Sequence, residues 1–276
     1  MMCRVLQVSR SGFYKWQKRG VSQRSQDDAK LRRCILSSHG ESRGTYGPIR
    51  IQKDLARQGI FVGRDRIRRL RNELRLRCVQ KRKYKATTNS KHQYPVVKNL
   101  LGQDFSVRDP GKVWGVDLTY IATGEGWLYL AGVKDYGSQE LVGYAMGSRM
   151  TQGLTGEALQ RALRTRRPEP GCLHHSDRGS QYCAHEYQRL VKNAGLTASM
   201  SRKGNCYDNA PIESFWGALK QELIHVRRFS TRREAMAAIR EYIEIFYNRI
   251  RLHSSIGYRP PSIYTENYFK QRRISA

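Results

Sequence analysis

The sequence predicts an α/β protein in which a mixed β-sheet with flanking helices follows an all-α module similar to a helix-turn-helix. Helical periodicity dominates before residue 80, whereas apolar and β-branched runs begin at Val113. The length of 276 residues allows one sizeable core and a smaller module. The expected domains are a partial helix-turn-helix over 1–20, a helix-turn-helix-like module over 21–79, a basic linker over 80–108, an α/β core over 109–225 and its helical extension over 226–276.

The chain is strongly basic, with 51 Lys and Arg against 23 Asp and Glu and a net charge of +28. Such an excess favours a nucleic-acid partner, because cationic side chains release counterions from phosphates and steer association. Residues 1–108 carry 27 basic against 7 acidic residues, a net of +20, and residues 109–276 carry 24 against 16, a net of +8. The first part is therefore the stronger candidate for gripping duplex DNA.

Other composition signals exclude several classes of protein. No run approaches the roughly 20 apolar residues of a membrane-spanning helix, and the first residues form no signal peptide, so a membrane partner is not expected. The six cysteines are scattered without a close pair, which predicts reduced thiols rather than a zinc site or disulfides. His174 and His175 are neighbours on a predicted strand and point to opposite faces, which favours structural roles. The predicted location is the cytoplasm.

The basic part of the chain has helical signals throughout. Residues 3–16 are similar to the second half of a helix-turn-helix, with Ser9 able to cap its last helix. Helices are then expected over 24–39, 48–58 and 64–75, punctuated by Pro48 and Gly59. In the last helix an apolar stripe is surrounded by basic side chains, namely Arg64, Arg66, Arg68, Arg69 and Arg71. This pattern favours a DNA-contacting helix over the alternative of a solvated basic face.

The remaining chain predicts a mixed sheet. Three apolar runs at 113–121, 127–134 and 139–147, separated by glycine-bearing turns, predict an antiparallel meander. Helices and strands then alternate, with helices expected over 152–166, 184–194 and from about 209, and strands over 171–176 and 197–201. That alternation predicts a parallel portion of the same sheet. The layout is consistent with a ribonuclease-H-like core, although the pattern alone leaves other α/β folds open.

Three acidic residues stand where this layout brings carboxylates together. Asp117 lies on the first strand, Asp177 directly follows the fourth, and Glu213 lies in the first turns of the helix after the fifth. The two aspartates converge if the first and fourth strands are neighbours. Oxygen-only sites suit hard divalent cations, and two such ions about 4 Å apart can activate an attacking oxygen and stabilise a leaving one. The sequence therefore predicts a metal site for phosphodiester chemistry.

Several longer motifs resemble those of the insertion-sequence transposases with two overlapping reading frames, family three, which are relatives of retroviral integrases. The resemblance covers almost the whole chain, and 35 residues separate Asp177 from Glu213, as in that family. A closing motif runs from Tyr247 to Pro261. The other segments that carry the resemblance are Trp114–Tyr120, Gly126–Ala131, His175–Tyr182, Ser199–Ala210 and Glu213–Trp216.

The resemblance implies a DDE-type strand transferase acting on double-stranded DNA at element ends and targets, as a homo-oligomer, near a bacterial nucleoid. Asp117, Asp177 and Glu213 would ligate two Mg²⁺ or Mn²⁺ ions. Lys220 lies seven residues after Glu213 on the same helix face and matches a residue that contacts terminal DNA, its alternative being a solvated surface lysine. Arg178 and Lys203 are further candidates for DNA contacts.

Some alternatives stay open at this point. The amino-terminal motif is incomplete, so a first-frame partner or an upstream fusion is expected to help recognise element ends. A metal-dependent nuclease without joining activity and a non-catalytic DNA-binding regulator are competing functions. Asp135 and Asp208 are expected to have structural roles, the latter as a helix N-cap, while Trp114, Trp127 and Trp216 are expected in the core rather than as base-stacking platforms.

Overall fold

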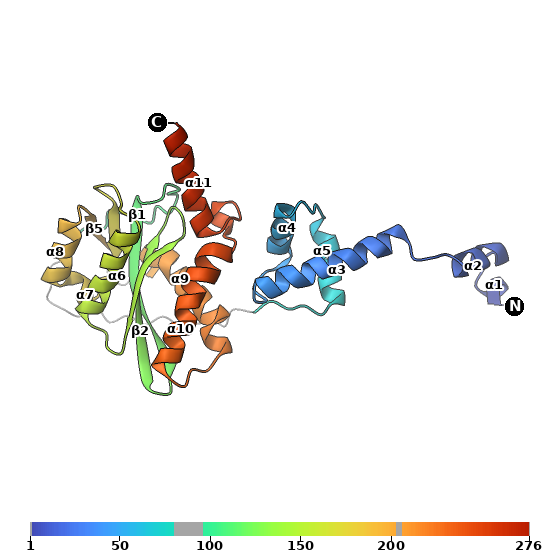
Figure 1. Ribbon diagram of the computed structural model, residues 1–276, viewed down its shortest axis with the longest axis horizontal. Helices are drawn as coiled ribbons and strands as arrows, with labels where there is room; N and C mark the ends of the chain where they lie inside the picture. The colour runs from blue at the N-terminus through green and yellow to red at the C-terminus, as the bar shows by residue number, and fades with distance from the viewer. Residues whose placement is uncertain (1, 80–95, 203–205, 276) are drawn as a thin grey trace. The chain divides into compact units, whose positions relative to one another are not determined.

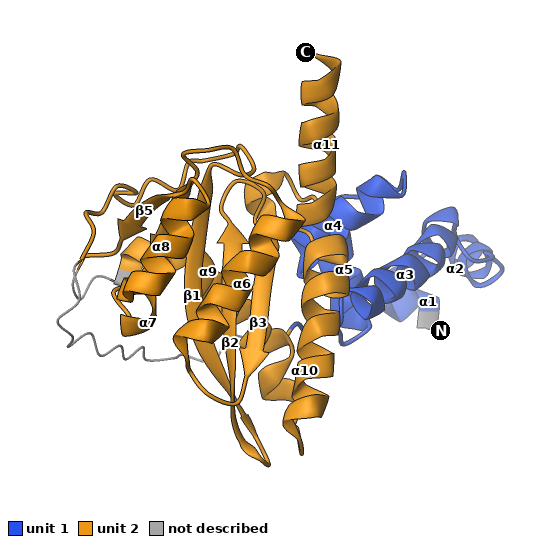
Figure 2. Ribbon diagram, turned by 60° about the vertical axis from the view of Figure 1, so that its left-hand side comes forward, with its two compact units in different colours: residues 1–78 blue, residues 79–276 orange. Residues whose placement is uncertain are grey.

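The computed structural model describes residues 2–79, 96–202 and 206–275 (Figure 1). The chain forms two compact units, residues 1–78 and 79–276, which are coloured separately in Figure 2. The first part of the expected basic linker, up to residue 95, lies outside the described residues, as does Lys203.

The first unit is helical, as predicted. The short helices α1 (Met2–Val5) and α2 (Arg10–Gln17) come first, and Ser9 caps α2 by accepting from the Gly12 amide at 3.0 Å. Helices α3 (Gln23–Glu41), α4 (Pro48–Arg57) and α5 (Arg64–Glu73) then enclose a small apolar core. This core contains Ile35, Ile51, Leu55, Ile67 and Leu70.

A mixed five-stranded sheet forms the centre of the second unit and confirms the predicted fold class. Strands β1 (Val113–Thr123), β2 (Gly126–Asp135) and β3 (Leu141–Gly147) form the antiparallel meander. Strands β4 (Leu173–Ser176) and β5 (Thr197–Met200) continue the sheet in parallel pairings. The order β3-β2-β1-β4-β5 makes β1 and β4 neighbours, which is the condition for Asp117 and Asp177 to converge.

Helices cover the sheet on its two faces. Helices α6 (Gln152–Thr165), α7 (Ser180–Cys183) and α8 (His185–Asn193) pack over one face (Figure 2). The other face receives α9 (Ala210–Glu222), α10 (Arg232–Glu241) and the π-helix η3 (Tyr242–Ile250). The short turns η1 (Cys206–Asn209), η2 (Ile224–Val226) and η4 (Ser254–Ile256) and the last helix α11 (Pro261–Ile274) complete the unit.

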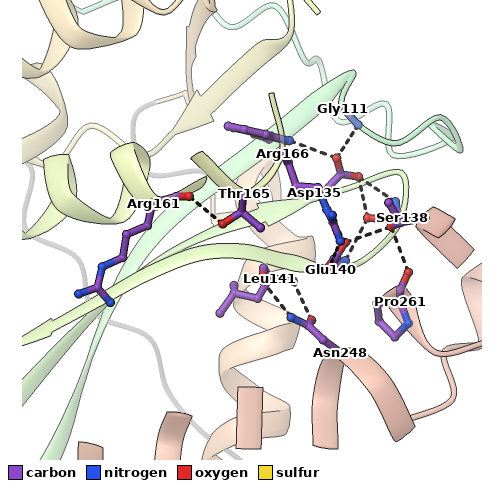
Figure 3. Close-up of polar contacts among 12 residues, drawn as sticks. Gly111, Asp135, Ser138, Glu140, Leu141, Arg161, Thr165, Arg166, Asn248 and Pro261 are labelled. Atoms are coloured by element: carbon purple, nitrogen blue, oxygen red, sulfur yellow. Dashed lines mark hydrogen bonds and ion pairs between the residues drawn. The ribbon is translucent and has the colours of Figure 1, made fainter. Parts of the chain in front are cut away.

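The closing motif attaches this helical extension to the sheet. The Asn248 side chain accepts from the Leu141 amide and donates to the Leu141 carbonyl, each at 3.1 Å (Figure 3). Arg251 forms a buried ion pair with Glu222, at 2.7 Å, near the end of α9. Both residues are therefore used in packing, so the motif connects the extension to β3 and to the end of α9.

Two expectations need correction. Residues 96–108, expected as the end of a linker, pack on the second unit: Leu101 is buried, and the Leu100 amide donates to Ser199 Oγ at 2.9 Å. Asp208 is structural but does not cap α9, whose N-cap is Asn209. Asp208 is instead buried, where it accepts from Arg202, Asn99 and Gln103. The charge-rich composition concealed both features.

Candidate active site

Asp117 lies where β1 leaves its pairing with β4. The last pair in the parallel register is Val116 with Ser176, so Asp117 and Asp177 follow adjoining positions on neighbouring strands. The Asp117 carboxylate accepts from the Leu118 amide at 2.7 Å through Oδ1 and from Trp216 Nε1 at 3.0 Å through Oδ2. One bond comes from its own strand and the other from α9, so the strand and the helix orient this carboxylate together.

Trp216 reaches Asp117 because Gly132 leaves room for its indole. Gly132 pairs with Asp117 across β1 and β2, and a Cβ atom there would lie 2.8 Å from Trp216 Cη2. Trp216 is buried as the sequence predicted, but its ring nitrogen also serves the site. Nothing in the sequence pattern indicated this second role.

Asp177 sits at the start of a tight loop after β4. Its Oδ1 accepts from the Gly179 amide at 2.9 Å, and a Cβ atom on Gly179 would lie 3.0 Å from that same oxygen. The next residue, Arg178, donates from Nε to the Ser201 carbonyl at 2.7 Å. Part of the Arg178 guanidinium therefore ties the loop to the end of β5.

The three predicted carboxylates act on one another electrostatically. Burial raises the pKa of Asp117, and the charges of Asp177 and Glu213 raise it further. Glu213 lies in the first turn of α9 and is exposed as a whole residue. Partial desolvation of its carboxyl group and the charge of Asp177 likewise raise its pKa. In the described chain, however, no three His, Cys, Asp or Glu side chains lie close enough to form a ready metal-ligand set. The three carboxylates lie in one region of the structure, but they are not arranged around a single position that an ion could occupy.

A buried hydroxyl group borders the same region. Tyr182 Oη is buried and has no hydrogen-bond partner among the described residues. Burial raises the pKa of Tyr182, and the nearby charges of Asp117 and Asp177 add to the effect. An unpaired buried donor beside two carboxylates is costly in isolation, so it points to a polar group that completes the site.

The start of α9 is anchored by buried polar groups that the sequence analysis missed. Lys134, only 1% exposed, donates from Nζ to the Pro211 carbonyl at 2.8 Å. The Tyr136 hydroxyl donates to Asn209 Oδ1 at 3.0 Å, and Asn209 Nδ2 donates to the Val116 carbonyl at 3.3 Å. These bonds fix the first turn of α9, and with it Glu213, relative to β1 and β2. A lysine inside an otherwise apolar strand was the available signal.

Lys134 is also unusual in its titration. Burial lowers the pKa of its amine to about 7, and the charge of Arg251 contributes to the lowering. Both the ammonium and the neutral amine carry N–H donors, so the bond to Pro211 is available on either side of that pH.

The Lys220 side chain lies close to the site, as predicted from the helix spacing. Its Nζ lies 5.3 Å from the ring centroid of Tyr120. Burial lowers the pKa of Lys220, while the charges of Tyr120 and Asp117 oppose this lowering. Lys220 is therefore near Asp117, on the side where β1 extends past β4.

The residues expected to be structural behave as such. His174 pairs with the Tyr187 hydroxyl at 3.0 Å and His175 with Ser199 Oγ at 2.9 Å, and burial lowers the pKa of each imidazole to about 4. Asp135 accepts from Trp114 Nε1 at 3.1 Å. It also accepts from the Ser138 amide at 2.8 Å (Figure 3). These side chains shape the fold around the site.

The arginines of α5 do not form one continuous DNA-facing surface. Arg64 and Arg68 are exposed, whereas Arg66 and Arg69 form ion pairs with Asp28 on α3. Arg71 is only 7% exposed and donates to Cys78 Sγ at 3.1 Å. Arg71 is therefore withdrawn from the expected DNA contacts, because its burial leaves it unable to reach a phosphate.

Comparison with known proteins gives consistent matches along the chain. Residues 107–206 and 194–261 match two models described as "Integrase core domain", and residues 25–84 match one described as "HTH-like domain". The described residues include no helix long and apolar enough to cross a membrane.

Similar proteins come from bacteria and from a retroviral complex. An insertion element IS600 protein of 31 kDa from Shigella sonnei is 58% identical and covers 97% of this chain and 98% of its own length. The transposase InsF of insertion sequence IS3A from Escherichia coli K12 is 41% identical, covering 93% of this chain and 90% of its own. A chain of the simian T-cell lymphotropic virus intasome aligns with a TM-score of 0.48 at 15% identity, over 78% of this chain and 70% of that one.

The sequence matches decide the classification. Identity of 41% over nearly the whole length of a transposase, together with the integrase core, assigns the chain a transposase function and polynucleotidyl transfer. The chain belongs to the IS3 family of insertion-sequence transposases.

Proposed function

We propose that Asp117, Asp177 and Glu213 are the catalytic carboxylates of a DDE-type transposase that cleaves a DNA strand and joins it to a target. The observation that carries this proposal is the electrostatic coupling of the three side chains. Asp177 and Glu213 both raise the pKa of Asp117, although the three belong to different elements of the fold. Their mutual repulsion is the expected state of a cation site before the cation binds.

The residues fit divalent metal ions by their chemistry. All three offer carboxylate oxygens, the donors that Mg²⁺ and Mn²⁺ prefer, and the unpaired Tyr182 hydroxyl faces the same charges. Two ions held by Asp117, Asp177 and Glu213 would supply Lewis-acid activation of the attacking oxygen and charge stabilisation of the leaving one. Exposed Glu213 would complete the ligand set by moving towards the partly buried aspartates.

The chain's own groups set the geometry of the reaction. Trp216 and the Leu118 amide hold the Asp117 carboxylate, the Gly179 amide holds that of Asp177, and Lys134 holds the first turn of α9. In the first step, water attacks a phosphodiester, and the products are a 3′-hydroxyl and a 5′-phosphate. In the second, that 3′-hydroxyl loses its proton as its oxygen bonds to a target phosphorus, and a target 3′-oxygen departs. No protein side chain becomes covalently attached.

Double-stranded DNA is the proposed substrate in both steps. The exposed Arg64 and Arg68 of α5 are proposed to contact duplex phosphates, and Lys220 is proposed to contact the strand that enters the acid site. Arg66 and Arg69 can contribute only in part, because Asp28 already binds both. Arg178 is proposed to contact a phosphate beside the Asp177 loop, where its Nε also donates to the Ser201 carbonyl. The homo-oligomer on paired ends stays a prediction.

The test is cleavage and joining of labelled element-end DNA by the full chain with Mg²⁺ or Mn²⁺, comparing wild type with Glu213→Gln. The matched control is Glu186→Gln, because Glu186 is also exposed in the first turn of a helix, α8. Metal-dependent nicked and joined products that only Glu213→Gln loses would support the proposal. Products retained by Glu213→Gln would refute the role of Glu213, and nicked products without joined ones would indicate a nuclease.

A further inference from the structure

An exposed pair of aromatic rings stands at the end of the β1–β2 hairpin. Tyr120 is 45% exposed and Trp127 is 49% exposed, so the expectation that Trp127 belongs to the core is wrong. Their ring centroids lie 4.9 Å apart with an interplanar angle of 82°. Two large rings kept in water are costly unless a partner covers them, and a contiguous exposed apolar patch often marks a binding surface.

This pair is connected to the acid site by Lys220. Tyr120 follows Asp117 by three residues of extended strand, which corresponds to about 10 Å and places the two side chains on opposite faces of β1. A DNA strand that passes from one to the other therefore has to go round the side of β1. Strand β4 pairs only with residues 113–116, so beyond Val116 the described strands leave one side of β1 open. Lys220 reaches this open side from α9, with its Nζ 5.3 Å from the Tyr120 ring and within electrostatic range of Asp117.

The hairpin that carries the pair is held firmly. Arg232, at the start of α10, donates from Nε to the Trp127 carbonyl at 3.0 Å, and its amide donates to Glu125 Oε2 at 2.8 Å. The Gly124 amide donates to the Phe229 carbonyl at 2.9 Å. A Cβ atom on Gly124 would lie 2.5 Å from the Ser230 carbonyl oxygen, so the turn packs directly on the segment before α10. The rings therefore sit on a preformed support.

We propose that an unpaired base at the DNA end that is cut stacks on the Trp127 ring, with the nearly perpendicular Tyr120 ring along the edge of the base and Lys220 beside the neighbouring phosphates. The proposal rests on the function proposed above. A distance of about 10 Å spans roughly three base steps of about 3.4 Å, so bases near a phosphodiester at the carboxylates come within reach of the rings. Aromatic rings accept any base, because every base has a stacking face.

The end of a duplex is the source of such a base. Asp117 is partly buried, and a strand that has left the duplex can approach such a carboxylate more closely than one held in a paired helix. Unpairing costs least where the bases are already frayed or single-stranded, which favours a DNA end over the interior of a target. Stacking on Trp127 and edge contact with Tyr120 offset the lost base stacking, and Lys220 adds charge where the backbone passes.

The experiment compares binding of the full chain to two DNA probes in the absence of divalent metal. One probe is a fluorescent duplex with a fully paired end, and the other carries a short unpaired tail at that end. Wild type is expected to prefer the tailed probe, and Tyr120→Ala and Trp127→Ala are expected to weaken that preference about tenfold. Trp127→Phe should restore much of it. The control is Phe269→Ala on α11, where the ring is 39% exposed, and it should leave the preference unchanged.

The outcomes separate this proposal from the proposed function. An equal preference in wild type, Tyr120→Ala and Trp127→Ala would overturn the stacking platform even if cleavage proceeds with Mg²⁺. A preference that depends on the two rings, in a protein that gives no metal-dependent products, would instead overturn the strand-transfer function and leave the platform standing. Thermal unfolding checks that the variants are folded, which is expected because both side chains are exposed.

Discussion

Helix α9, which carries Glu213, and helix α5, which carries the exposed arginines, are held in different ways. Buried polar groups fix α9 at both ends, through Lys134 at its first turn and Arg251 near its last. Helix α5 packs through a narrow apolar stripe, and its ion pairs with Asp28 involve arginine side chains that are 34% and 42% exposed. A carboxylate that takes part in chemistry needs an exact position, whereas a contact with phosphate acts over a longer range and tolerates movement.

The largest effect is expected from breaking the buried ion pair between Arg251 and Glu222 near the end of α9. Arg251→Met leaves Glu222 buried without its partner, and we expect a loss of about 3–5 kcal/mol in the free energy of unfolding. Arg272→Met is the control, because its pair with Glu169 is exposed and screened by water, so its loss should change the free energy of unfolding far less. Denaturant unfolding measures both. Equal losses in the two variants would contradict the idea that α9 depends on the buried pair.

A smaller effect is expected where α9 meets Asp117. Trp216→Phe keeps an aromatic ring in the core but removes the N–H that donates to Asp117 Oδ2. We expect metal affinity or cleavage rate to fall about 10- to 100-fold, as for other residues that orient a metal ligand. The measurement is cleavage rate against Mg²⁺ concentration, with Trp114→Phe as the control because its N–H serves Asp135. An unchanged Mg²⁺ dependence in Trp216→Phe would show that this bond does not position the carboxylate.

Lys134, which holds the first turn of α9, should make the stability of the protein depend on pH. In the folded protein the pKa of Lys134 is about 7, against about 10.4 in an unfolded chain, so above pH 7 the unfolded state binds more protons. The contribution of Lys134 to the free energy of unfolding should therefore rise with pH, by at most about 1.4 kcal/mol per unit.

The comparison of wild type with Lys134→Met between pH 7 and pH 9 isolates this contribution. The variant has no titrating amine and should lack the extra rise, whereas Lys192→Met, which removes an exposed lysine, should keep it. Parallel stability curves for wild type and Lys134→Met would mean that Lys134 remains charged in the folded state.

The smallest effects concern α5. Arg64→Ala and Arg68→Ala should each weaken DNA binding without sequence preference and reduce the salt slope of log K by about 1. Arg71→Gln should leave that slope unchanged, because Arg71 is buried against Cys78. Titrations at several salt concentrations provide the measurement. A reduced slope in Arg71→Gln would show that α5 rearranges on DNA.

Local periodicity was sufficient to predict most of the fold. The meander appeared as apolar runs between glycine turns, and the two parallel strands appeared as short runs between amphipathic helices, so both parts of the sheet were predicted correctly. The three acidic residues lie on the elements that the sequence predicted, Asp117 in β1, Asp177 directly after β4 and Glu213 in the first turn of α9, while their catalytic role stays a prediction.

Features that depend on tertiary contacts were not predictable. Lys134 stands in an otherwise apolar strand, but a lysine is usually solvated; here β2 is flanked by β3 and β1, and the start of α9 contacts the side chain. Trp127 looks like core, but it lies near the turn of the β1–β2 hairpin with 49% of its surface exposed. The reverse held for Arg71, which lies four residues after Ile67 on the apolar side of α5 but was expected to be exposed because of its charge. In each case the identity of the neighbour, rather than the residue type, decided burial.

The Asn248 amide has a consequence for how the molecule behaves at high concentration. Strand β3 lies at an end of the sheet order, where free peptide groups can recruit a strand from another molecule. Asn248 offers Leu141 the same donor and acceptor as a neighbouring peptide would. The Asn248 side chain thus takes the place of a neighbouring strand at this point. The Leu141 amide and carbonyl are both already bonded to it, so they cannot begin edge-to-edge aggregation.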